Sequence, residues 1–123
     1  MLQHVRLVVV DDDHDFRMLL VTLLSAADGV EVVGDAADGH EALEVVERTG
    51  PDGVVVDLLM PGMDGFELID RLRERWPAMR LVANSAIATT TRAGDVSRLG
   101  VPVLPKSSDP DVLLAALRDG TEG

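Results

Sequence analysis

Residues 53–65 of the chain, GVVVDLLMPGMDG, contain a complete strand-to-helix junction. Gly53–Val56 is a short valine-rich run, which predicts a strand buried on both faces. Asp64 stands three residues before Glu67, the spacing of a helix N-terminal capping box with aspartate as the cap. An acidic residue, Asp57, therefore lies between a buried strand and the start of a helix.

The same alternation of strand and helix recurs along the whole chain. Apolar residues at helical spacing separate the strands and predict helices between them. Short apolar runs predict strands at residues 5–10, 30–33, 53–56, 80–83 and 101–104. The last of these contains Pro102, so we expect it at an edge of the sheet. The fourth helix, at residues 90–99, contains poor helix formers.

Five such β-α units predict an α/β fold, in which right-handed crossovers produce a doubly wound parallel sheet with helices on both faces. A chain of 123 residues has the usual size of one domain, so we expect a single domain over residues 1–123. Hydrophobic residues make up 46% of the chain, which is enough to build its core.

Composition excludes several classes of function. The chain has 11 basic and 22 acidic residues, and a net charge of −11 repels nucleic-acid phosphates. It has no cysteine, so it has neither a disulfide framework nor a thiol nucleophile. No apolar run approaches the ~20 residues of a membrane span, and three aspartates end the first apolar stretch, unlike a secretion signal. We expect a soluble, cytoplasmic protein without nucleic-acid or membrane partners.

Polar residues follow four of the predicted strands, at the end where ligands bind in open parallel sheets. They are Asp11 with Asp12, then Asp57, then Asn84 with Ser85, and Lys106. Converging carboxylates repel one another, and a hard divalent cation such as Mg²⁺ relieves that repulsion. A hydroxyl and an ammonium then supply donors for an anionic group beside the metal. Together these groups indicate a phosphoryl-transfer site.

Lys106 is also unusual because the other ten basic residues are all arginine. A lone lysine after an edge strand would ordinarily be surface charge. The otherwise complete use of arginine favours a role that a guanidinium cannot fill.

These motifs resemble the receiver domain of bacterial two-component response regulators. The resemblance rests on residues 9–12 (VVDD), residues 56–65 (VDLLMPGMDG), Ser85 with Ala86, and Lys106. It covers essentially the whole chain. It implies a flavodoxin-like fold with strand order 2-1-3-4-5, and a phosphoprotein that serves signalling and has no enzymatic role beyond its own phosphotransfer and autodephosphorylation.

The resemblance also implies a role for each matching residue. Asp57 would accept the phosphoryl group from a sensor histidine kinase, a phosphotransfer protein or a small phosphodonor. Asp11, Asp12, Asp57 and the backbone carbonyl of Leu59 would hold Mg²⁺. Ser85 and Lys106 would contact the phosphoryl oxygens. Movement of these two residues would switch an output face formed by the fourth helix, the fifth strand and the fifth helix.

Two positions depart from the family pattern. Val103 stands where an aromatic residue commonly rotates inward on activation, and Ser107 stands where a proline often follows the lysine. A receiver-like interaction module that is not phosphorylated therefore stays open as an alternative. The sequence also leaves open the output partner and whether the chain forms a homodimer.

A second alternative is a phosphatase of the haloacid-dehalogenase type. Such enzymes use an Asp-x-Asp motif after the first strand, here Asp11 and Asp13, followed by a Ser or Thr and a Lys. Against it, the fourth position after Asp11 is Asp15 and not the usual Thr or Val. The motif around Asp57 would also have no explanation.

Overall fold

We describe a computed structural model of the chain, in which residues 4–86 and 100–119 are placed. Strands and helices alternate as the sequence predicts. The strands are β1 (Val5–Val10), β2 (Val30–Ala36), β3 (Gly53–Val56), β4 (Arg80–Ser85) and β5 (Val103–Pro105). The helices are α1 (His14–Ser25), α2 (Gly39–Thr49), α3 (Gly65–Arg75) and α5 (Pro110–Asp119).

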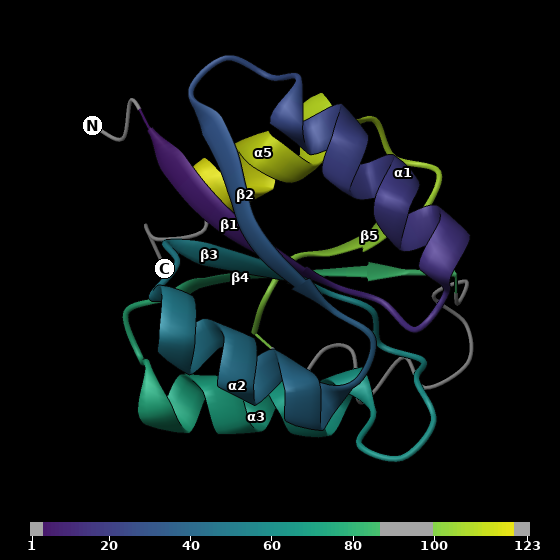
Figure 1. Cartoon of the computed structure of the whole chain (residues 1–123), viewed down its shortest axis with the longest axis vertical. Coiled ribbons are helices and arrows are strands. Elements are labelled where there is room, and N and C mark those ends of the chain that lie inside the picture. The colour runs from purple at the N-terminus through teal and green to yellow at the C-terminus, as the bar shows by residue number, and fades with distance from the viewer. Residues whose placement is uncertain (1–3, 87–99, 120–123) are drawn as a thin grey trace.

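The strands form one five-stranded parallel sheet of order β2-β1-β3-β4-β5, which confirms the expected fold. Helices α1 and α5 cover one face, and α2 and α3 cover the other (Figure 1). All strands point the same way, so their carboxyl ends meet at one end of the sheet. The predicted site residues follow these ends.

Aspartates at the helix starts fix where three of the helices begin. The carboxylates of Asp13, Asp38 and Asp64 each accept a hydrogen bond from the backbone N–H three residues later, which satisfies a donor that the helix cannot pair. At the other end, α2 stops at Gly50, whose φ of 56° lies in the left-handed region. These caps hold the loops after β1 and β3 in place.

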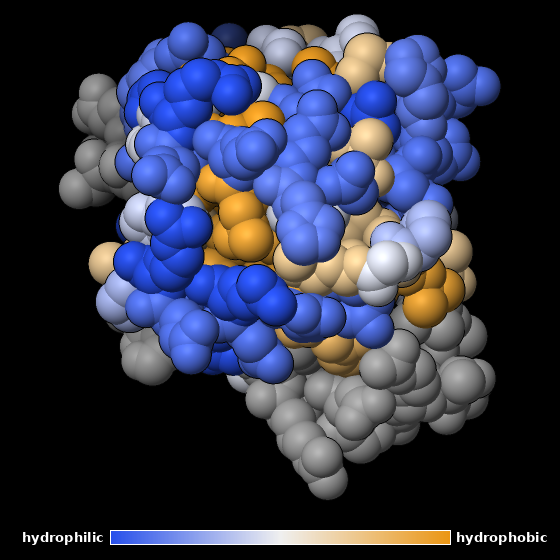
Figure 2. Space-filling view, turned by 60° about the horizontal axis from the view of Figure 1, so that its bottom comes forward, coloured by the Kyte–Doolittle hydropathy of each residue, from blue (hydrophilic) through white to orange (hydrophobic). Residues whose placement is uncertain are grey.

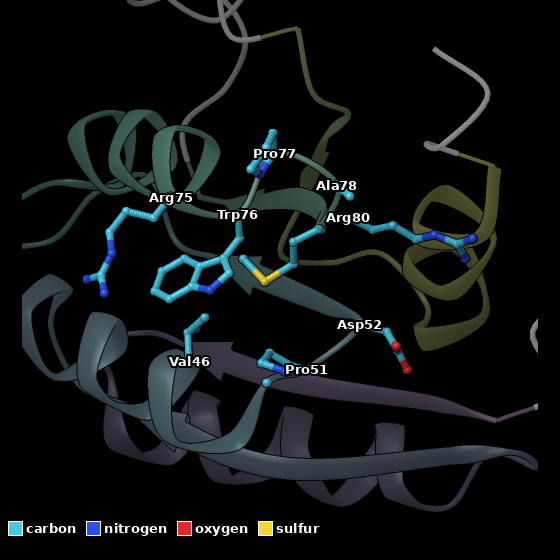
Figure 3. Close-up of a pocket in the computed structure, with 10 residues that line it drawn as sticks. Val46, Pro51, Asp52, Arg75, Trp76, Pro77, Ala78 and Arg80 are labelled. Atoms are coloured by element: carbon cyan, nitrogen blue, oxygen red, sulfur yellow. The ribbon is translucent and has the colours of Figure 1, made fainter.

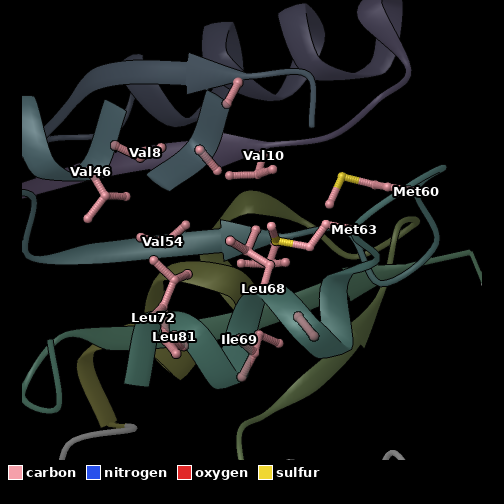
Figure 4. Close-up of a cluster of buried hydrophobic side chains, with 14 of the residues drawn as sticks. Val8, Val10, Val46, Val54, Met60, Met63, Leu68, Ile69, Leu72 and Leu81 are labelled. Atoms are coloured by element: carbon pink, nitrogen blue, oxygen red, sulfur yellow. The ribbon is translucent and has the colours of Figure 1, made fainter. Parts of the chain in front are cut away.

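Two hydrophobic clusters, one on each face of the sheet, form the core. The cluster beneath α2 and α3 includes Val8, Val54 and Leu68 (Figure 4). The cluster beneath α1 and α5 includes Leu7, Val55 and Leu113. Because side chains alternate along a strand, the valines of β1 and β3 contribute to both clusters. Apart from Arg6, β1 and β3 are therefore buried, and the polar site residues follow directly after them.

The strand boundaries differ from the sequence prediction in three places. β5 begins at Val103, two residues later than expected, because Pro102 has no N–H to donate to the ladder. β4 continues beyond the predicted residues 80–83 to Ser85. β2 continues to Ala36, because a register shift next to Gly34 lets the strand pass beneath α2. A Cβ at Gly34 would lie 2.6 Å from Val45 Cγ1. The helix predicted at residues 90–99 lies outside the described residues.

The face with α2 and α3 is mostly hydrophilic, with a hydrophobic strip visible between the charged side chains (Figure 2). Among the described helices, none has the length and apolar content that crossing a bilayer requires.

Candidate functional site

The structure brings together the acidic residues that follow β1 and β3. Asp57 N donates to Val10 O at 3.0 Å, so the ladder between β1 and β3 continues one residue past the end of β3. Asp11 and Asp57 are buried, each 2% exposed, whereas Asp12 lies at the surface. One carboxylate oxygen from each of the three lies within 4.8 Å of the others. This confirms that the carboxylates converge.

Lys106 reaches this acidic cluster from β5, across the end of β4. Its Nζ lies 2.8 Å from Asp11 Oδ2 and 3.3 Å from Asp57 Oδ2. It also lies 4.7 Å from the centre of the Phe16 ring, in a cation–π arrangement. The ammonium therefore bridges two buried carboxylates, with an aromatic face beside it.

Ser85 and Leu59 complete the set of residues that the sequence singled out. Ser85 is buried at the end of β4, and its backbone carbonyl accepts a hydrogen bond from Lys106 N at 3.1 Å. Leu59 N donates to Asp57 Oδ1 at 3.1 Å, while its side chain is exposed. The two oxygens of Asp57 thus have different partners, because Oδ1 accepts from the loop and Oδ2 faces Lys106.

The surroundings of Asp57 and Lys106 raise the pKa of both groups, for different reasons. Burial raises the pKa of the Asp57 carboxyl to about 7, and the charge of Asp11 adds to the rise, while the Leu59 N–H and the Lys106 ammonium oppose it. Burial disfavours the charged form of Lys106, but its hydrogen bond to Asp11 and the charge of Asp57 outweigh this and raise its pKa above the ordinary value. Lys106 is therefore charged at neutral pH, where Asp57 titrates.

Arg17 supports the acidic cluster from behind, a role that the sequence analysis missed. This α1 residue is only 8% exposed. Its Nη1 donates to the backbone carbonyl of Asp11 at 2.7 Å, and its Nε donates to Asp35 Oδ1 at 2.9 Å. The signal was present in the sequence. Arg17 shares the helical stripe of Leu20 and Leu24, and a charged residue at a buried position needs a buried partner.

A second hollow lies at the opposite end of the sheet, around Trp76 and Pro51 (Figure 3). Its volume is about 530 Å³. Two of its charged groups, Asp52 and Arg75, already have partners. Asp52 Oδ2 accepts from Arg6 N at 2.9 Å, and Arg75 stacks on Trp76 while pairing with Glu47 at 3.0 Å. This hollow carries no converging carboxylates, so the chemistry belongs to the other end.

Residues 7–118 match the family model of the response regulator receiver domain. The chain belongs to this family. The receiver domain is 33% identical over 118 residues to the nitrate/nitrite response regulator protein NarL of Escherichia coli, which covers 95% of this chain and 55% of that protein. It is 38% identical over 111 residues to a protein-glutamate methylesterase/protein-glutamine glutaminase of Geobacter metallireducens, which covers 86% of this chain and 31% of that protein. The chain thus spans less than two thirds of either relative.

Solved structures agree with this assignment. The signal receiver domain of the response regulator NarL from Mycobacterium tuberculosis matches with a TM-score of 0.85 at 34% identity, and 98% of each chain is covered. The response regulator domain of Thermotoga maritima CheB matches with a TM-score of 0.83 at 26% identity over 98% of each chain. The receiver domain is a signalling module of two-component systems. This resolves the choice against a haloacid-dehalogenase-like phosphatase.

Proposed function

We propose that this receiver domain accepts a phosphoryl group on Asp57, with Mg²⁺ bound by Asp11, Asp12, Asp57 and the backbone carbonyl of Leu59. The observation that carries the proposal is the convergence of three carboxylates on one end of the sheet, with the Lys106 ammonium in contact with two of them. The donor would be a histidine kinase, a phosphotransfer protein or a small phosphodonor. A cytoplasmic location and a homodimer stay predictions.

The acidic cluster fits a hard divalent cation. Oxygen atoms of three carboxylates lie within 4.8 Å of one another, and oxygen is the ligand that Mg²⁺ prefers. Two of the three carboxylates are buried, and one ammonium cannot neutralise the whole cluster. When bound, Mg²⁺ would supply positive charge that offsets the repulsion between these carboxylates and an incoming phosphate.

The residues of the chain would divide the transfer among them. One Asp57 oxygen forms a bond to phosphorus while the bond from phosphorus to the donor nitrogen or oxygen breaks, and the electron pair stays with the donor. Leu59 N–H fixes the rotation of the Asp57 carboxylate. Lys106 offers a positive charge beside the attacking carboxylate, and the Ser85 hydroxyl binds a phosphoryl oxygen. Asp57 attacks as the carboxylate, the form that the Lys106 ammonium and a bound cation both favour.

The added phosphoryl group would change the charge at the end of the sheet and bias the positions of Ser85 and Lys106. Through them it would act on the face that includes β5 and α5, where an output partner would bind. Val103 packs against the core in place of an aromatic residue, so the rotation of an aromatic side chain cannot report the change here.

Intact-mass spectrometry after incubation with acetyl phosphate and Mg²⁺ tests the proposal. We expect one phosphoryl adduct in the wild type, none without Mg²⁺ and none in Asp57→Asn. Asp13→Asn is the matched control, because Asp13 caps α1 and asparagine caps a helix equally well. An adduct that persists in Asp57→Asn would refute the assignment of Asp57. If neither acetyl phosphate nor a purified histidine kinase produces an adduct, the unphosphorylated interaction module becomes the better description.

A further inference from the structure

Asn84 is a buried polar residue of the sheet whose side-chain oxygen has no hydrogen-bond partner among the described residues. This residue lies near the end of β4 and is only 2% exposed, and the oxygen concerned is Oδ1. A buried acceptor without a partner destabilises the folded state, because it has lost its hydrogen bonds to water. The proposed phosphotransfer steps do not use Asn84, although it lies next to the site.

The register of the sheet places Asn84 in the row of the acidic residues. Val56 pairs with Ala83, so the residues that follow them, Asp57 and Asn84, are neighbours across adjacent strands. Asn84 in turn pairs with Leu104 of β5, which packs against the cluster beneath α1 and α5. Alternation along the strand puts Asn84 on that same face of the sheet, together with Val82.

Lys106 must cross this position to reach its carboxylates. β4 lies between β3 and β5 in the sheet, and Lys106 is the first residue after β5. Its Nζ nevertheless contacts Asp57 after β3 and Asp11 after β1. The lysine side chain therefore spans the end of β4, where the buried carboxamide of Asn84 lies.

We propose that Asn84 is a positioning residue whose Oδ1 accepts a hydrogen bond from the Lys106 ammonium when Mg²⁺ takes the Asp11 carboxylate. The inference rests on the proposed function, because it assumes that Asp11 binds the metal. Mg²⁺ held by Asp11 would compete with Nζ, which now lies 2.8 Å from Asp11 Oδ2, and its charge would repel the ammonium. The Lys106 side chain is only 20% exposed, and Nζ would keep Asp57 Oδ2 at 3.3 Å, so one acceptor would have to replace Asp11. Asn84 supplies one without adding another negative charge.

The affinity for Mg²⁺, measured by calorimetry, tests this role. Asn84→Leu keeps the number and branching of the side-chain heavy atoms and removes the acceptor, and we expect it to bind Mg²⁺ about tenfold more weakly, as the loss of one hydrogen bond to a charged group implies. In a Lys106→Met background the same substitution should change the affinity by less than about twofold, because no ammonium needs an acceptor. An unchanged affinity in Asn84→Leu, or an equal loss in both backgrounds, would overturn the proposal.

Urea unfolding without Mg²⁺ separates this role from a structural one. If Asn84 has no partner in the metal-free protein, Asn84→Leu should raise the unfolding midpoint, whereas loss of a structural hydrogen bond would lower it. A lowered midpoint therefore contradicts the proposal. Failure of the wild type to bind Mg²⁺ would refute the proposed function itself. Normal binding and phosphorylation in both proteins would refute only the role of Asn84.

Discussion

At the amino-terminal end of the sheet Arg6 and Asp52 have hydrogen-bond partners, whereas at the carboxyl end three carboxylates converge and the one ammonium that reaches them, among the described residues, contacts two. Near Trp76, the Arg6 guanidinium donates to the carbonyls of Thr49 and Gly50 at the end of α2, and Asp52 accepts from the Arg6 backbone. At the other end, Asp57 is buried beside Asp11, and its pKa is raised accordingly.

The difference shows that the two ends serve different purposes. An end whose charged groups have hydrogen-bond partners stabilises the folded chain without a bound ligand. An end with excess buried negative charge costs stability, and binding a cation or a proton recovers it. The following changes test this contrast, because substitutions at the carboxyl end should alter metal and proton linkage while those at the amino-terminal end should not.

The largest effect is expected for Asp57→Asn in the absence of Mg²⁺. The carboxyl pKa rises from 3.8 to about 7 on folding, so the folded state holds the proton more tightly. The cost is absent below pH 3.8 and complete above pH 7. At pH 8 the variant should be more stable by about 3 kcal/mol, which allows for solvent screening at the open end of the sheet.

Urea unfolding of both proteins at pH 8 and at pH 4 measures this effect. The stability gain of Asp57→Asn should nearly disappear at pH 4. A gain of equal size at both values would show that the charge of Asp57 is not its source.

Gly65→Ala should have the next largest effect. A Cβ at Gly65 would overlap the Asp57 carbonyl oxygen and the Leu58 Cα, whereas one at Gly62 would meet nothing within 4 Å. Gly65→Ala should therefore lower the unfolding free energy by about 2 kcal/mol and weaken Mg²⁺ binding, because the displaced backbone carries Asp57. Gly62→Ala is the matched control. It is strained only by its φ of 76°, and it should cost about 1 kcal/mol without a change in Mg²⁺ affinity. Equal Mg²⁺ affinities in the two variants would contradict this account.

At the amino-terminal end, Asp52→Ala should lower the unfolding free energy by about 1 kcal/mol. It removes the acceptor for the backbone N–H of Arg6, at a distance of 2.9 Å. Because Asp52 lies at the far end of the sheet, the affinity for Mg²⁺ and the yield of phosphoryl adduct should not change. A shift of more than about threefold in either would mean that the two ends are coupled.

The smallest effect is expected for Glu47→Gln, which removes the ion pair with Arg75. Both side chains are largely exposed, at 67% and 47%, so the pair should contribute less than about 0.5 kcal/mol. The free energy of unfolding of the variant should equal that of the wild type both in low and in high salt. A clear loss of unfolding free energy at low salt would show that the ion pair also holds Arg75 over the Trp76 ring.

Much of the site could be predicted because strand ends are visible in a sequence. Asp11, Asp57, Ser85 and Lys106 follow apolar runs, and parallel strands bring their carboxyl ends together. The aspartate caps could be predicted for a similar reason, since a cap and the N–H that it binds are three residues apart.

Residues that support the site from other elements could not be assigned in this way. Arg17, in a helix, binds the Asp11 carbonyl and Asp35. Asn84 does follow an apolar run, but its pairing with Leu104 and its lack of a hydrogen-bond partner within the described part of the chain could not be predicted. The contacts of these residues depend on which strands are adjacent and on the register between them. The start of β5 was missed for a local reason, because Pro102 accepts a hydrogen bond from Ala83 N of β4 but has no N–H to donate.

The sequence by itself determined the alternation of strands and helices, the parallel sheet and the residues at its carboxyl end, because burial periodicity and helix caps are encoded within a few neighbouring positions. Only the tertiary structure decided that Lys106 contacts Asp11 as well as Asp57, that burial raises the pKa of Asp57 to about 7, and that Asn84 is enclosed beside them. Lys106 and Asp57 are 49 residues apart, and their contact depends on strand order and register. The electrostatics follow from that contact and from the solvent that the fold excludes.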